Sequence, residues 1–169
     1  MPREIVITEC HEAKRVADEL IPRHHPHLLD ARILYLKTTA ERKKCDRVRL
    51  ASAAKLGALQ KYLSSLHMDA RQEASIYRGA DFLMLIGEVE WGQLSTTQRV
   101  ALVDHELLHM KRVEKITDTG VEASWGLRGH TVEAFAEEIE RHGLWKSDLR
   151  VMAEVMQQRV PLEPAEVRV

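Results

Sequence analysis

Residues 95–109 read STTQRVALVDHELLH, and this stretch predicts the helix around which the rest of the chain is organised. Ser95 with Gln98 three residues later has the form of a capping box, which starts a helix at about Thr96. We expect that helix to continue to about Lys115. Within it two histidines lie four residues apart, so their side chains project from one face, one turn apart.

These two histidines, His105 and His109, enclose Glu106 in the pattern HExxH. Both imidazoles can reach one metal ion, whereas Glu106 lies about 100° further around the helix and is better placed to accept a proton from a metal-bound water. Imidazole suits Zn²⁺, and catalytic zinc sites combine three protein ligands with an open position. The pattern therefore predicts a catalytic zinc site, and the alternative is two surface histidines on an amphipathic helix.

A third ligand has to come from another segment, and the sequence offers two candidates, His130 and Glu133. They lie three residues apart at the start of a predicted helix over residues 131–142, so both can face one side. His130 would complete a three-histidine site, and Glu133 a site of two histidines and one glutamate. The residues alone leave both open, together with the case that neither binds the metal.

Hydrophobic patterning along the chain predicts an α+β fold. Apolar runs and alternation predict strands over residues 31–39 and 81–91. Helical spacing predicts helices over residues 11–21, 51–65, 131–142 and 147–158. We expect Pro22 to end the first of these helices, and Gly143 to cap the third.

The chain has 169 residues, which suits one domain over residues 1–160 and a loose tail over residues 161–169. Its net charge of −1 argues against broad electrostatic capture of nucleic acid or an anionic membrane. The longest apolar run, residues 82–87, is far below membrane-spanning length, so no membrane partner is expected. The two cysteines form no CxxC pair, which favours a reduced, cytoplasmic protein.

Basic residues dominate the stretch from Arg42 to Lys61, where only Asp46 offsets them. We interpret this stretch as a solvated helix face, and contact with nucleic acid is the alternative that is not favoured.

A second group of histidines surrounds Pro26 and comprises His24, His25 and His27. The flanking prolines and the polarity predict a solvated loop, with a second metal site as the alternative. We also expect Asp104, which precedes the first histidine of the motif, to be exposed.

Four blocks of the sequence resemble the putative phage metallopeptidase family, over about residues 28 to 145. The blocks are Asp81–Ile86, Asp104–His109, His130–Phe135 and Arg141–Trp145. In the third block, Thr131 and Ala134 stand where the family pattern carries acids. The glycine and histidine of this block, placed after an HExxH helix, are also similar to SprT-like metalloproteases, in which that histidine is the third zinc ligand. This similarity favours His130 over Glu133.

The resemblance implies a zincin-like fold, with a small mixed or antiparallel sheet packed against a central HExxH helix and further helices. It also implies a zinc-dependent metallopeptidase acting on a protein or peptide substrate, with Glu106 as the general base for a metal-activated water. A phage-encoded protein of this kind would work in the host cell cytoplasm. Zincins pair the substrate with an edge strand, for which residues 82–91 are the candidate. The alternative is a zincin-like metal-binding module without turnover, with or without a nucleic-acid partner.

Overall fold

The computed structural model describes residues 4–44, 47–68, 79–132, 136–145 and 147–159. The chain divides into two compact units, residues 1–128 and residues 129–169, and each is described by itself. The single domain expected over residues 1–160 stays a prediction, and the tail over residues 161–169 lies outside the described residues.

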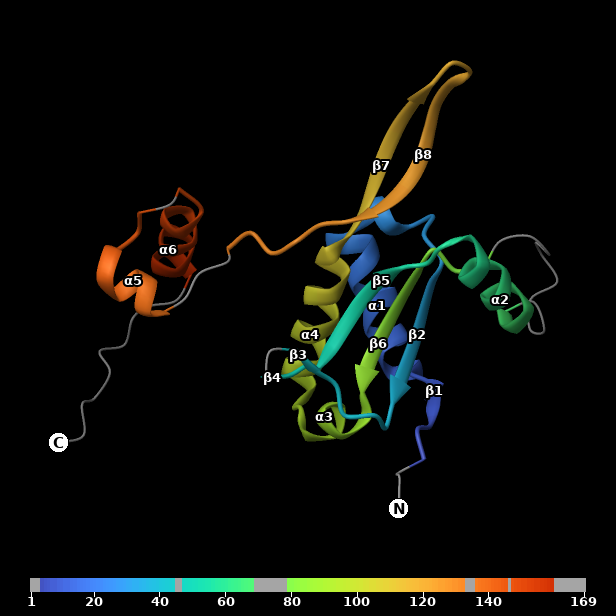
Figure 1. Cartoon of the computed structure of the whole chain (residues 1–169), viewed down its shortest axis with the longest axis horizontal. Coiled ribbons are helices and arrows are strands. Elements are labelled where there is room, and N and C mark those ends of the chain that lie inside the picture. The colour runs from blue at the N-terminus through green and yellow to red at the C-terminus, as the bar shows by residue number, and fades with distance from the viewer. Residues whose placement is uncertain (1–3, 45–46, 69–78, 133–135, 146, 160–169) are drawn as a thin grey trace. The chain divides into compact units, whose positions relative to one another are not determined.

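The first unit contains a four-stranded sheet in the order β1, β2, β6, β5 (Figure 1). Its strands are β1 (Ile7–Glu9), β2 (Ile33–Thr38), β5 (Ala51–Lys55) and β6 (Phe82–Gly87). The central pair β2 and β6 is parallel, whereas β1 and β5 run antiparallel to their neighbours. The sheet is therefore mixed, and the predicted strands over residues 31–39 and the first part of residues 81–91 are confirmed.

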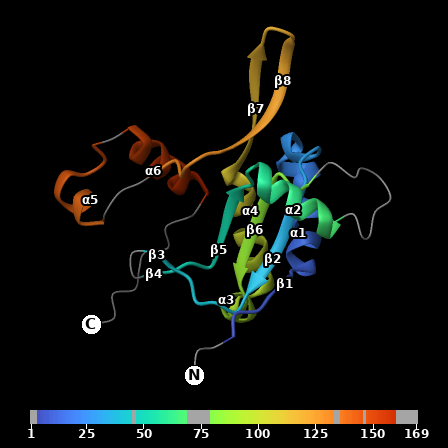
Figure 2. The same ribbon diagram turned by 45° about the vertical axis from the view of Figure 1, so that its right-hand side comes forward.

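Two helices, α1 (His11–His24) and α4 (Thr96–His109), cover one face of this sheet (Figures 1 and 2). Strand residues point alternately to opposite faces, and Phe82, Met84 and Ile86 of β6 point to this face, where they are fully buried. They pack with residues from both helices, including Ala17 and Val103. The expected α+β fold, with a small sheet packed against helices, is thereby confirmed.

The opposite face of the sheet is partly covered by α2 (Ala58–Met68). Leu34, Leu36 and Leu83 on the strands and Leu63 on the helix line a groove there of about 750 Å³. The sequence predicted one helix over residues 51–65, but the structure places β5 before the helix begins. Pairing with β6 thus overrides the helical propensity of the alanine-rich residues 51–55.

Helix α4 begins as predicted. The Ser95 hydroxyl accepts a hydrogen bond from the backbone of Gln98 at 3.3 Å, and the Gln98 side chain accepts one from the backbone of Ser95 at 2.9 Å. This reciprocal capping box satisfies two amides that the first helical turn would otherwise leave unpaired.

The end of α4 differs from the prediction, because the helix stops at His109 rather than near Lys115. The next residues form a hairpin of β7 (Met110–Thr117) and β8 (Gly120–Leu127), which projects from the sheet as a two-stranded ribbon (Figure 1). Its turn ends at Gly120, whose φ of 136° strongly favours glycine. Strand pairing with residues 120–127 therefore competes successfully with continuation of the helix.

Two other boundaries were predicted wrongly. Helix α1 continues through Pro22 to His24: the proline removes its own backbone donor, but the helical hydrogen bonding resumes after it, where the N–H of His25 donates to the carbonyl of Ile21 at 3.0 Å. The expected strand over residues 81–91 changes after Gly87 into the short helix α3 (Glu88–Gln93), which buries Trp91. Acidic residues in the first turn of α3 favour the helix through its dipole.

The remaining elements are small. The 3₁₀ helix η1 (Pro26–Leu28) follows α1, and β3 (Lys43–Lys44) pairs with β4 (Arg47–Val48). In the second unit, α5 (Ala136–His142) is capped by Gly143 at φ 63°, as predicted, and α6 (Ser147–Arg159) corresponds to the last predicted helix.

Within the described residues, no helix is both long enough and apolar enough to cross a bilayer. Cys10 is buried in the core, and this burial raises the pKa of its thiol. The cytoplasmic location stays a prediction.

The capping box generates a test of how far α4 depends on its first turn. We expect Ser95→Ala to lower the free energy of unfolding by about 1 kcal/mol, because it leaves a first-turn amide without its acceptor. Urea unfolding followed by circular dichroism measures the change. Ser95→Asp, which keeps an acceptor at this position, should stay close to the parent, and equal losses in both variants would contradict this account of the cap.

Candidate metal centre

The last five residues of α4 are the HExxH motif, His105–His109. Because the helix is regular through this turn, both motif histidines project from one side, and their ring centroids lie 5.0 Å apart. His105 is exposed and His109 is half-buried. Both motif histidines are therefore accessible to solvent.

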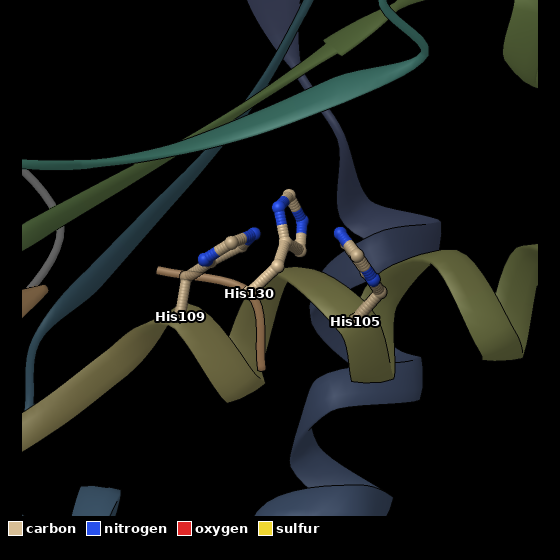
Figure 3. A group of neighbouring side chains, drawn as sticks. All are labelled: His105, His109 and His130. Atoms are coloured by element: carbon tan, nitrogen blue, oxygen red, sulfur yellow. The ribbon is translucent and has the colours of Figure 1, made fainter. Parts of the chain in front are cut away.

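His130 joins this pair from the segment that follows β8. One ligand nitrogen from each of His105, His109 and His130 lies within 4.8 Å of the others, and Figure 3 shows the three imidazoles converging beside α4. Around a tetrahedral zinc with Zn–N bonds of about 2.0–2.1 Å, such nitrogens stand about 3.3 Å apart. The three histidines are therefore grouped closely enough to be compatible with a metal site.

Arg128 anchors the second motif histidine and the end of α4 through three hydrogen bonds. Its backbone N–H donates to the carbonyl of His109 at 2.8 Å, and its guanidinium Nε donates to the carbonyl of Leu108. Its own carbonyl accepts a hydrogen bond from Nδ1 of His109 at 2.8 Å. Because a carbonyl can only accept, this last bond places the proton of a neutral His109 on Nδ1, which makes Nε2 the nitrogen that would bind a metal.

No motif in the sequence marks Arg128 as part of the site. Two of its three bonds are made by backbone groups, which every residue except proline offers, so no residue type signals them. The third depends on the early end of α4 at His109, which the sequence pattern does not predict either.

Glu106 lies on the buried side of α4 and is only 5% exposed. The pKa of Arg42 is lowered, mainly by burial and further by the positive charge of Arg49. The negative charge of Glu106 partly offsets this by raising the same pKa. The carboxylate of Glu106 therefore lies within electrostatic range of Arg42. Its role as general base stays a prediction, and Glu133, the alternative third ligand, lies outside the described residues.

Asp104 was expected to be simply exposed, but its carboxylate is 2.6 Å from Nε2 of His25. The side chain of Asp104 remains 41% exposed while it holds this buried partner. Asp104 thus has a structural contact immediately before the first motif histidine.

The basic stretch from Arg42 to Lys61 does not form one solvated helix face. The described residues in it are distributed over β3, β4, β5 and α2. Arg42 donates to the carbonyl of Leu85 at 2.8 Å, and Lys61 pairs with Asp81 at 2.5 Å. Because these cations serve contacts within the chain, the structure gives no support to a nucleic-acid partner.

The mixed sheet, the central helix and the converging imidazoles define a zincin-like α+β protein with a candidate metal centre. The family described as "Putative phage metallopeptidase" matches residues 6–157, and the chain belongs to this family. Membership implies a protein or peptide substrate. No curated protein and no solved structure matched the chain. The similarity to SprT-like metalloproteases stays a prediction.

The geometry predicts which histidines retain a metal. Protein loaded with zinc and then dialysed should keep one zinc per chain, and His130→Ala should lose most of it, because two imidazoles alone leave the ion weakly held. Elemental analysis measures the ratio. His142→Ala, at an exposed histidine at the end of α5, serves as the control and should match the parent.

Glu133→Gln separates the two candidate third ligands. It should retain zinc if His130 is the ligand. Full zinc content in His130→Ala, together with its loss in Glu133→Gln, would contradict the three-histidine site.

Proposed function

We propose that this protein is a zinc-dependent metallopeptidase that hydrolyses peptide bonds, with His105, His109 and His130 as zinc ligands and Glu106 as general base. The observation that carries the proposal is the convergence of three imidazole nitrogens within 4.8 Å at the HExxH turn of α4. Membership in a metallopeptidase family supports the same reaction class.

The chemistry of the donors supports zinc as the metal. Three neutral imidazoles are a ligand set that catalytic zinc sites use, and the carbonyl of Arg128 orients one of them through Nδ1. Among the described residues the group has three members, which leaves the fourth tetrahedral position to water or substrate. When bound, zinc supplies a water of lowered pKa and polarises the carbonyl of the scissile bond.

Glu106 would transfer the proton in this reaction. It follows the first ligand directly, and its low exposure excludes most competing water from the carboxylate. A carboxylate in this place accepts a proton from the attacking water and delivers it to the leaving amine. This role requires the Glu106 carboxylate to reach the water that the three histidines would hold on the metal.

The strand predicted to pair with the substrate has to be reassigned. The candidate from the sequence was the segment of residues 82–91, but β6 is flanked by β2 on one side and β5 on the other and has no edge to offer. Strand β5 is an edge strand and packs against α4. We therefore assign the substrate-pairing edge to β5.

The backbone of β5 is oriented for this role. The carbonyl of Leu50 accepts a hydrogen bond from Gly87 of β6, and the N–H of Leu56 donates to Asp81, just before β6. In an antiparallel pair, successive residues point their backbone groups alternately toward and away from the partner strand. The backbone groups of Ala51, Ala53 and Lys55 therefore point away from β6. Arg49 occupies the carbonyl of Ala51 at 3.2 Å. An extended peptide would pair along the remaining groups, with its backbone presented beside α4.

The general-base assignment is tested with Glu106→Gln. The variant should bind zinc like the parent but cleave peptide bonds about 10²- to 10⁴-fold more slowly, because the amide has nearly the same shape but cannot accept the proton. Zinc content and the cleavage of a denatured, fluorescently labelled protein are measured side by side. Glu90→Gln, at a carboxylate on α3 outside the motif, is the control.

Equal cleavage rates in Glu106→Gln and the parent would show that another group is the base. A parent that retains one zinc per chain but cleaves neither denatured proteins nor peptide libraries would instead favour the metal-binding module without turnover.

A further inference from the structure

The short segment that follows α1 contacts the chain immediately before and immediately after the HExxH turn. Nε2 of His25 lies 2.6 Å from a carboxylate oxygen of Asp104, the residue before His105. Nε2 of His27 lies 3.1 Å from the carbonyl of Met110, the residue after His109. Two histidines that are two residues apart thus bracket the five residues of the motif.

His25 is a buried group rather than part of a solvated loop, which corrects the expectation from the sequence. It is 1% exposed, and within the described part of the chain its Nδ1 has no hydrogen-bond partner. The bond from Nε2 to Asp104 is therefore the side-chain hydrogen bond that offsets the burial of this ring. Moving Asp104 away would leave this buried ring without that hydrogen bond, so the contact favours one position of Asp104.

The second-metal-site alternative for these histidines is not supported. His25 already uses Nε2 for Asp104, and His27 uses Nε2 for the carbonyl of Met110. Among the described residues, the group of side chains suited to hold a metal is the triad of His105, His109 and His130.

We propose that residues 25–27 act as a clamp that positions the metal-binding turn of α4, with His25 and His27 as positioning residues for the zinc site. This inference rests on the proposed function, since it concerns the same site. His25 fixes the rotation of the helix just before the first ligand. His27 fixes the point at which the chain leaves the helix, just after the second.

Residues 25–27 are themselves held in place by the core and by α1. Pro26 has a restricted backbone, and Leu28 at the end of η1 is buried in the core at 1% exposure. The backbone N–H of His25 donates to Ile21 of α1 at 3.0 Å. The clamp therefore fixes the motif relative to α1 and the core. Metal ligands have to be held to within a fraction of an ångström for tight binding.

A clamp predicts changes in the affinity for zinc that a general loss of stability does not explain. We expect His25→Ala and His27→Ala each to weaken zinc binding about tenfold, measured by competition with a chromogenic chelator, because the ligands are no longer held in place. The visible spectrum of the Co²⁺-loaded protein should also change, since it reports the geometry around the ion. His27 is exposed, so its variant is readily compared even if the variant at buried His25 unfolds.

Conservative variants should restore zinc binding. His25→Gln and His27→Gln place an amide N–H near the position of Nε2, so both should bind zinc close to the parent and restore its Co²⁺ spectrum. A role in packing alone would not restore the spectrum with an amide in place of the ring.

Glu12→Ala is the matched control, because it also removes a contact between α1 and α4, at the end of α4 remote from the motif. Glu12 accepts hydrogen bonds from Arg99 at 3.1 Å and from Trp91 at 2.7 Å. This variant should lose stability in urea unfolding without a change in zinc affinity or in the Co²⁺ spectrum.

The outcomes separate the clamp from the zinc site itself. Parent-like zinc affinity and Co²⁺ spectrum in His27→Ala and in folded His25→Ala would overturn the clamp while leaving the proposed function intact. Equal weakening of zinc binding in Glu12→Ala would also overturn it. A parent protein that binds no zinc would overturn both the clamp and the proposed function.

Discussion

The final turn of α4 is the constraint on which the rest of the site depends. A regular helix is needed through His109 so that two imidazoles four residues apart share one side. The helix also has to end there, because the hairpin that follows brings Arg128 back to the carbonyls of Leu108 and His109. The early end of the helix and the anchoring of His109 thus depend on the same return of the chain at Arg128.

The edge strand β5 also positions α4, because the two elements pack against each other. The strand β5 carries Ala51 and Ala53 on the face toward α4, and these small side chains let the helix lie close to the edge of the sheet. Larger residues there would move the metal-binding turn away from the strand. The same alanines that misled the helix prediction for residues 51–65 therefore suit the strand that brings the edge beside the candidate metal centre.

Features that depend on local sequence were predictable, and features that depend on distant contacts were not. The capping box of Ser95 and Gln98, the glycine cap at Gly143 and the apolar strand β6 follow from local rules of backbone geometry and burial. The end of α4 and the strand β5 depend on pairing with partners far along the chain. In the site, the histidine spacing was visible in the sequence, whereas the carbonyl of Arg128 and the contact of His25 with Asp104 required the fold.

We propose that one zinc ion binds among His105, His109 and His130. A crystal structure of the zinc-loaded protein, with an anomalous difference map recorded at the zinc absorption edge, tests it most directly. We expect one strong peak about 2.0–2.1 Å from one nitrogen of each histidine, with the fourth position taken by a water or a small ligand. A peak coordinated by other residues, or four protein ligands closing the tetrahedron, would contradict it.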